Sequence, residues 1–189
     1  TAQTVTRFGL GFAPDTWDSL VRAMKALGYS EQELFDGGLV RHGKSGGVYD
    51  TFRNRLMFPV IDVRGNVIGF SGRILGDGEP KYMNSPETIV FSKSHNLFAL
   101  NLAKKSKCGY IILAEGNIDV ASLHQAGFDS AVASLGTSLT PEQARLLSRY
   151  TSEIVIAYDN DGAGQKASQR AIGILEKLDE GSLRSARDL

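Results

Sequence analysis

Three acidic residues stand where they could bind a divalent cation. Glu115 follows the apolar run 110–114, and Asp159 and Asp161 follow the apolar run 154–158. If both runs are neighbouring strands of a parallel sheet, their carboxyl ends meet at one edge, which is the usual functional edge of such a sheet. Hard cations such as Mg²⁺ prefer carboxylate oxygens, with water and phosphate oxygens completing the coordination. The spacing therefore predicts a metal site formed by Glu115, Asp159 and Asp161.

The second half of the chain alternates apolar runs with amphipathic segments, which indicates alternating strands and helices. Thr140 is a predicted helix N-cap, followed by a proline and by Gln143 as the capping-box partner. Because the strands are continuous apolar runs between helices, we expect a Rossmann-like parallel sheet covered by helices on both faces. Strands are predicted at 110–114, 130–135 and 154–158, and helices at 118–126, after 140 and at 163–178.

The first half mixes helical and strand patterns, so the fold class is α/β with a mixed α+β subdomain in front. Asp15 is predicted to cap a helix that carries Trp17 as a core anchor and ends at Gly28. Ser30 and Glu33 have the spacing of a capping box for a second helix. Further along, an exposed loop is predicted at 42–47, a hairpin at 57–63 and 67–70, a loop at 81–91 and a helix at 96–105.

The predicted domains are a basic α+β subdomain at 1–108, an α/β subdomain at 109–180 and a tail of uncertain origin at 181–189. Net charge is zero, but residues 51–107 carry nine lysines and arginines against four acids, whereas residues 109–180 carry five against ten. A basic half joined to an acidic half suits a polyanion lying beside a carboxylate metal site. On charge alone, a chance asymmetry between solvated faces explains the pattern equally well.

The apolar runs, the cysteine count and the first residues of the chain indicate the cellular compartment. No apolar stretch approaches the ~20 residues of a membrane-spanning helix, and the single cysteine, Cys108, cannot form an internal disulfide. The chain begins without a basic-then-apolar leader. We therefore expect a cytoplasmic protein without a membrane partner.

Several motifs follow one another in unbroken order from about Thr4 to Asp179. They are Arg7-Phe8-Gly9-Leu10-Gly11-Phe12-Ala13-Pro14, Phe52-Arg53-Asn54-Arg55-Leu56-Met57-Phe58-Pro59, Gly69-Phe70-Ser71-Gly72-Arg73, Pro80-Lys81-Tyr82-Met83-Asn84-Ser85-Pro86-Glu87-Thr88, Phe91-Ser92-Lys93, Ala114-Glu115-Gly116-Asn117-Ile118-Asp119-Val120, Ala133-Ser134-Leu135-Gly136-Thr137 and Tyr158-Asp159-Asn160-Asp161-Gly162-Ala163-Gly164. Together they resemble the catalytic core of bacterial DnaG-type DNA primases, an N-terminal subdomain followed by a Toprim domain, and several motifs in sequence are far more specific than any one.

The resemblance implies template-directed synthesis of short RNA primers from ribonucleoside triphosphates on single-stranded DNA during replication. It implies Mg²⁺, with Mn²⁺ as a substitute, bound by the catalytic acids Glu115, Asp159 and Asp161. Asp119 would orient a metal-bound water or cap its helix, and we favour the former. In the family a replicative helicase binds through a domain that this chain lacks. The positions that match template- and nucleotide-binding cations are Arg7, Arg53, Arg55, Arg73, Lys81 and Lys93.

The sequence departs from the family in three ways that leave alternatives open. Asn117 and Ile118 stand where an aromatic residue and methionine are usual, and Ser71 stands where glycine is common. Residues 181–189 do not match the family's further strand and aspartate pair. We therefore expect the chain to fold and bind metal or nucleotide weakly but to synthesise primers poorly. The alternatives are a Toprim nuclease or topoisomerase-like enzyme and a non-catalytic nucleic-acid-binding fragment. The basic motifs between 53 and 93 favour the primase.

Overall fold

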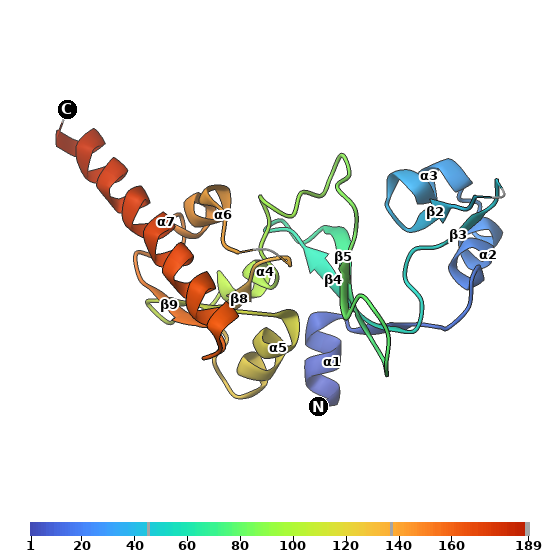
Figure 1. Ribbon diagram of the computed structural model, residues 1–189, viewed down its shortest axis with the longest axis horizontal. Helices are drawn as coiled ribbons and strands as arrows, with labels where there is room; N and C mark the ends of the chain where they lie inside the picture. Colours follow the sequence, from blue (N-terminus) through green and yellow to red (C-terminus); the bar gives the residue numbers. More distant parts are fainter. Residues whose placement is uncertain (45, 137, 188–189) are drawn as a thin grey trace. The chain divides into compact units, whose positions relative to one another are not determined.

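The computed structural model describes residues 1–44, 46–136 and 138–187, with side chains described as far as residue 178 (Figure 1). It divides into two compact units. The first comprises Thr1–Ile61 and Asn66–Ser92, and the second comprises Asp62–Gly65 and Lys93–Leu189. Within the described residues, no helix is both long and apolar enough to cross a membrane.

An antiparallel sheet carries the basic motifs of the first unit. It contains β1 (Gly11–Ala13), β4 (Arg55–Ile61), β5 (Val67–Ile74) and β6 (Tyr82–Asn84), in that order. The pairing of β4 with β5 confirms the predicted hairpin. By contrast, β6 lies in a segment that was expected to be a loop, because a strand of three residues is too short for alternation to reveal.

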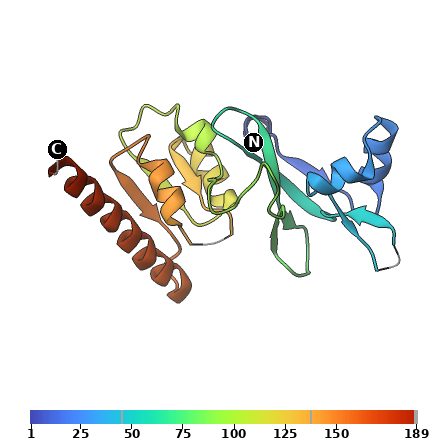
Figure 2. The same cartoon turned by 90° about the horizontal axis from the view of Figure 1, so that it is seen from above.

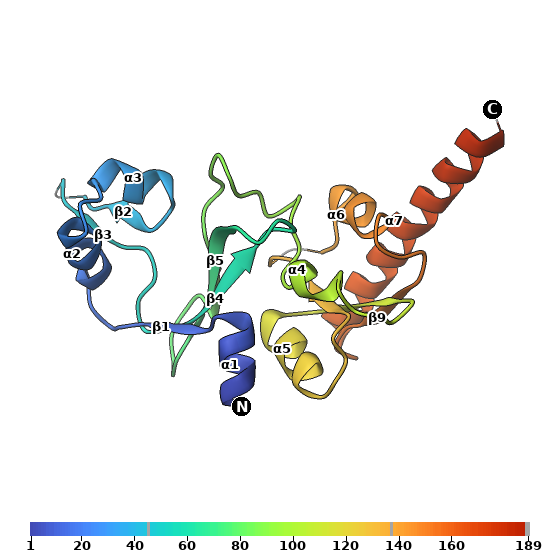
Figure 3. The same cartoon turned by 180° about the vertical axis from the view of Figure 1, so that it is seen from behind.

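A second part of the first unit combines α2 (Ser19–Ala26) and α3 (Glu31–Asp36) with a short hairpin of β2 (Val40–His42) and β3 (Val48–Asp50), all visible in Figure 3. The predicted capping box of α3 is confirmed. The Ser30 Oγ accepts from the Glu33 nitrogen at 3.2 Å, and a Glu33 carboxylate oxygen accepts from the Ser30 nitrogen at 2.8 Å. Val21, Leu34 and Val40 form a small buried cluster here.

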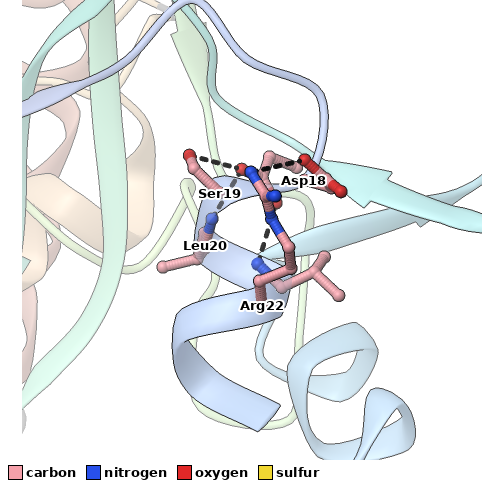
Figure 4. Close-up of polar contacts among 6 residues, drawn as sticks. Asp18, Ser19, Leu20 and Arg22 are labelled. Carbon is pink, nitrogen blue, oxygen red and sulfur yellow. Dashed lines mark hydrogen bonds and ion pairs between the residues drawn. The ribbon is translucent and has the colours of Figure 1, made fainter. Parts of the chain in front are cut away.

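The start of α2 differs from the prediction. The helix begins at Ser19 rather than after Asp15, and Trp17 is 65% exposed instead of anchoring the core. The N-terminal main-chain nitrogens of Leu20 and Val21 donate to the buried carboxylate of Asp50, at 2.8 and 3.0 Å. Because the cap comes from a residue 30 positions away, local spacing could not locate the helix start. Figure 4 shows this first turn, with the Asp18–Arg22 ion pair beside it.

The second unit contains the predicted parallel sheet, in the order β8 (Ala131–Ala133), β7 (Ile111–Ala114), β9 (Ile154–Ala157). One face packs against α4 (Leu100–Ala103), α6 (Pro141–Leu147) and α7 (Gly162–Arg187), with Leu113 and Val132 in that core. Val120 of α5 (Asn117–Gln125) is buried and α5 contacts β7 and β8, so it covers the other face. Figure 2 shows the length of α7 beside the sheet. The α/β arrangement is confirmed.

Two helices have bounds that the sequence did not give. The helix α4 is limited to four residues, whereas 96–105 was expected. The helix α7 runs to Arg187, whereas 163–178 was expected. The predicted tail at 181–189 lies outside the residues whose side chains are described, so its origin stays a prediction.

Candidate metal centre and basic surface

Glu115 and Asp159 lie side by side at the carboxyl edge of the parallel sheet. They follow the paired strands β7 and β9, whose last residues, Ala114 and Ala157, are register partners. The Glu115 Oε2 accepts a hydrogen bond from the main-chain nitrogen of Asp159 at 3.2 Å. The common edge on which the metal prediction depends is therefore present for these two residues.

Asp161 has a different position in the same loop. Its Oδ1 accepts from the main-chain nitrogens of Ala163 and Gly164, at 2.9 and 2.7 Å, and so caps the start of α7. Gly164 approaches the preceding main chain closely, since a Cβ added there would lie 2.0 Å from the Asp159 oxygen. Only glycine permits this approach, which fixes the loop that carries both aspartates.

The described residues contain no group of three His, Cys, Asp or Glu side chains arranged to hold a metal ion. A metal site formed by all three acids stays a prediction; one oxygen of Asp161 caps the start of α7 and leaves its second oxygen for a ligand. The donor set still fits a hard cation. Mg²⁺ in proteins commonly takes one or two carboxylates and completes its shell with water and substrate phosphates. Glu115 and Asp159 supply two such carboxylates.

A cavity of about 410 Å³ lies beside Glu115. The phenol of Tyr158 borders it, and its oxygen is buried with no hydrogen-bond partner. Burial and the charge of Glu115 raise the pKa of Tyr158 to about 12. The sequence did not single out Tyr158, because it reads as the last apolar residue of a strand. The cavity is lined by Glu115, Ser134, Gly136, Ser138, Tyr158, Ala163, Ala167 and Arg170.

Asp119 caps α5. Its Oδ2 accepts from the main-chain nitrogen of Gly116 at 3.0 Å, which is the second of the two roles considered from the sequence. A role in orienting a metal-bound water stays a prediction.

Arg55 is the most unusual of the six predicted cations, because its side chain is buried with only 4% of the residue exposed. Its Nη1 donates to the Gly72 and Lys81 oxygens at 3.2 and 3.4 Å, and its Nη2 donates to the Pro80 oxygen at 2.9 Å. Burial, and secondarily the charge of Arg53, lower the pKa of Arg55. The guanidinium thus holds the main chain before β6 and is turned away from solvent.

Lys81 and Arg73 lie at the segment that Arg55 holds. Lys81 is exposed, and Arg73 is the register partner of Tyr82 across β5 and β6. The Arg73 guanidinium lies 5.8 Å from the centre of the Tyr82 ring, within the range of a cation–π contact. The sequence had given Tyr82 no role, although it adjoins a predicted phosphate-binding lysine.

The other three predicted cations belong to different elements of the fold. Arg7 is exposed in the last turn of α1 (Ala2–Phe8), and Arg53 lies over the Trp17 ring. Lys93 is half-buried in the second unit, and its main-chain oxygen accepts from the Gln143 side chain at 2.9 Å. A common groove that faces the acids stays a prediction.

Comparison with known families decides what kind of protein combines these features. Residues 1–104, more than half of the chain, match the family model described as DNA primase catalytic core, N-terminal domain. The chain belongs to the DnaG-type DNA primase catalytic core family. Residues 112–187 match the Toprim-like family, so both parts of the predicted resemblance are confirmed.

The relatives of this primase core are similar in sequence and in fold. The DNA primase of Clostridium acetobutylicum is 53% identical over 176 residues, which cover 93% of this chain and 29% of that protein. A primase domain from Pseudomonas aeruginosa is 42% identical with a TM-score of 0.86, covering 93% of this chain and 56% of that one. A DnaG primase catalytic domain bound to single-stranded DNA is 42% identical with a TM-score of 0.81, covering 90% and 56%.

The primase-core chain spans under a third of the length of the Clostridium relative.

Proposed function

We propose that this chain carries out template-directed synthesis of short RNA primers on single-stranded DNA from ribonucleoside triphosphates, as a nucleotidyltransferase in DNA replication. The observation that carries the proposal is the contact between Glu115 and Asp159 at the sheet edge, in a chain whose two parts match a primase core and a Toprim-like domain. A related DnaG domain bound to single-stranded DNA supports the same class of template.

Toprim and primase families depend in general on divalent metal ions. Glu115, Asp159 and Asp161 are the residues that would hold a cation here, Mg²⁺ or Mn²⁺, and the Glu115 carboxylate contacts the main chain of Asp159. When bound, the ion lowers the pKa of the primer 3′ hydroxyl and neutralises charge on the triphosphate. Asp119 would act indirectly, by keeping the start of α5 in place beside Glu115.

The cations of the first unit would bind phosphates. Lys81 is exposed, and Arg73 lies beside an aromatic ring that can stack on a base. Arg55 would act through Lys81, because two of its donated hydrogen bonds, to the Pro80 and Lys81 oxygens, fix the main chain at 80–81. Arg7, Arg53 and Lys93 remain candidates for contacts with template or nucleotide. Nucleotide addition then joins the primer 3′ oxygen to the α-phosphorus while the bond to pyrophosphate breaks, and the hydroxyl proton passes to solvent.

The longer protein would act at the replication fork in the bacterial cytoplasm, with a replicative helicase as a partner.

Incorporation of labelled ribonucleotides on a single-stranded template, with Mg²⁺ or Mn²⁺ present, tests the proposed function. The expected products are short RNA strands that depend on template and metal and that disappear in Glu115→Gln. The matched control is Glu142→Gln in the same unit, where the glutamate pairs only with Arg145 at the surface. Cleavage of the DNA without RNA synthesis would point instead to a Toprim nuclease. Binding with neither reaction would point to a binding fragment.

A further inference from the structure

The first turns of α7 form one wall of the cavity beside Glu115, within the second unit. This wall consists of Ala163, Ala167 and Arg170. Residues three and four positions apart lie on the same face of a helix. The two alanine side chains are short and leave space, whereas Arg170 is long and exposed. A ligand in this cavity of about 410 Å³ would therefore meet a guanidinium group on the side of α7.

Three side chains that line the cavity carry hydrogen-bond donors without an acceptor. Within the described part of the chain, the Arg170 guanidinium forms neither a hydrogen bond nor an ion pair, and the Ser138 hydroxyl likewise has no partner. The Tyr158 oxygen is buried and also unpartnered. Water can satisfy the first two groups, but a buried phenol is normally hydrogen-bonded. The cavity is thus rich in donors and poor in acceptors, which favours a ligand made of acceptor oxygens.

Glu115 lines the same cavity with the opposite charge. Among the described residues no ion pair joins it to Arg170, and its Oε2 accepts from the main chain of Asp159. A bare anion would be attracted by Arg170 and repelled by Glu115, and a bare cation would meet the reverse. A phosphate chain that carries a divalent cation suits both groups, because guanidinium binds phosphate oxygens and carboxylate binds the cation.

A structural role does not explain Arg170. A structural arginine gives its donors to carboxylates or main-chain oxygens, as Arg55 does with three carbonyls. A helix arginine that is merely solvated would account for the exposure of Arg170 but not for its place beside Ser138 and Tyr158 around one cavity. Lys177 is the ordinary case. It is exposed on the same helix and does not line this cavity.

We propose that Arg170 and Ser138 bind the phosphate oxygens of a diphosphate or triphosphate group in this cavity, with Glu115 holding the accompanying divalent cation. Inorganic pyrophosphate and the triphosphate end of a nucleotide share this chemistry. Assignment of the group as the leaving pyrophosphate of nucleotide addition rests on the proposed function, whereas binding of pyrophosphate does not. In that reaction the bond from the α-phosphorus to its bridging oxygen breaks and leaves the electron pair on pyrophosphate. Arg170 would stabilise the charge that develops there.

Calorimetric titration of the chain with inorganic pyrophosphate in excess Mg²⁺ measures this binding directly. We expect saturable binding that Arg170→Gln weakens roughly 10- to 100-fold, the effect of losing a charged hydrogen-bond donor. Arg170→Lys should recover part of the affinity, because lysine keeps the charge but lacks the planar fork of donors. Ser138→Ala, which removes a neutral donor, should weaken binding about 2- to 10-fold.

Lys177→Gln is the matched control, because it removes the same charge from an exposed site about two turns further along α7. It should leave the pyrophosphate affinity unchanged. Electron paramagnetic resonance of Mn²⁺ without pyrophosphate should show equal metal affinity in Arg170→Gln and wild type, which separates Arg170 from the metal-binding acids. Excess oligothymidylate should not displace pyrophosphate. Displacement would assign the cavity to the phosphodiesters of a strand and reject the proposal.

Equal pyrophosphate affinities of Arg170→Gln and Lys177→Gln, or no saturable binding to wild type, would overturn the proposal. If Arg170→Gln lowers the thermal midpoint of unfolding, Arg170→Lys decides, since it retains most of the side chain. The proposed primase function would fail separately. Ribonucleotide incorporation with a pyrophosphate affinity that Arg170→Gln leaves unchanged rejects only the phosphate site. Pyrophosphate binding that depends on Arg170, without incorporation, keeps the site and rejects the primase activity.

Discussion

The Glu115 carboxylate accepts a hydrogen bond from the main-chain nitrogen of Asp159 at 3.2 Å, although 44 residues separate them in the chain. The change Glu115→Gln retains an oxygen that can accept this bond, so the loop should keep its conformation. It removes the negative charge that a hard cation needs. We expect Mn²⁺ affinity, measured by electron paramagnetic resonance, to fall more than about tenfold. Equal Mn²⁺ affinities of Glu115→Gln and the control Glu142→Gln would exclude Glu115 as a ligand.

Gly164 gives a second test of the same site. A Cβ at this position would lie 2.0 Å from the Asp159 oxygen, so Gly164→Ala must displace the main chain that carries Asp159. We expect a loss of about 1–3 kcal/mol in the free energy of unfolding and weaker Mn²⁺ binding. Gly173→Ala in the same helix is the control, because its added Cβ meets nothing within 4 Å. That change should stabilise the protein by about 0.5–1 kcal/mol. Similar denaturant midpoints for the two variants would refute the steric argument.

Arg55 tests whether a buried cation positions the basic surface. Arg55→Met fills a similar volume but removes the guanidinium donor from the Gly72, Pro80 and Lys81 oxygens, of which the Lys81 oxygen keeps its bond from the Ile74 nitrogen. Relief from burying the charge offsets part of this loss, so we expect a net destabilisation of about 2 kcal/mol. Affinity for single-stranded DNA should also fall, because Lys81 loses its fixed main chain. Arg64→Met, which changes an exposed turn residue, is the control. If Arg55→Met binds DNA as well as Arg64→Met does, the positioning role is wrong.

Local signals accounted for much of the fold, and long-range contacts account for what was missed. The two residues of a capping box, such as Ser30 and Glu33, are three positions apart, and a short apolar run such as 111–114 is typical of a buried strand. The Asp50 cap of α2 and the three carbonyls on Arg55 join positions 17 to 31 residues apart, so no window of sequence contains them. The strands β2, β3 and β6 are three residues each, which is shorter than any periodicity can resolve.

In the candidate site, too, the features set by local sequence were predicted, and the features set by tertiary packing were not. The edge shared by Glu115 and Asp159 follows from two strand ends, and the sequence predicted it. The capping role of Asp161 depends on how α7 begins, and the unpartnered phenol of Tyr158 depends on packing from several elements. Trp17 was predicted wrongly for a different reason. Its apolar character predicted a buried side chain, but α2 begins after it, at Ser19, and the side chain is exposed.

Tyr158 gives a prediction for pH. Burial and the Glu115 charge raise its pKa to about 12, whereas the pKa of a tyrosine in the unfolded chain is about 10. Between these values the folded state binds more protons than the unfolded state, so the free energy of unfolding contributed by Tyr158 is fully present below about pH 10 and declines as pH rises toward 12. Tyr158→Phe removes this group, and the buried phenol oxygen that it deletes has no hydrogen-bond partner. The variant should therefore be at least as stable as wild type at pH 8, and its advantage should grow from pH 10 to 12 in urea unfolding.

Tyr150→Phe is the control, since Tyr150 is 40% exposed. A stability difference between Tyr158→Phe and wild type that stays constant across that range would show that the phenol ionises equally in both states.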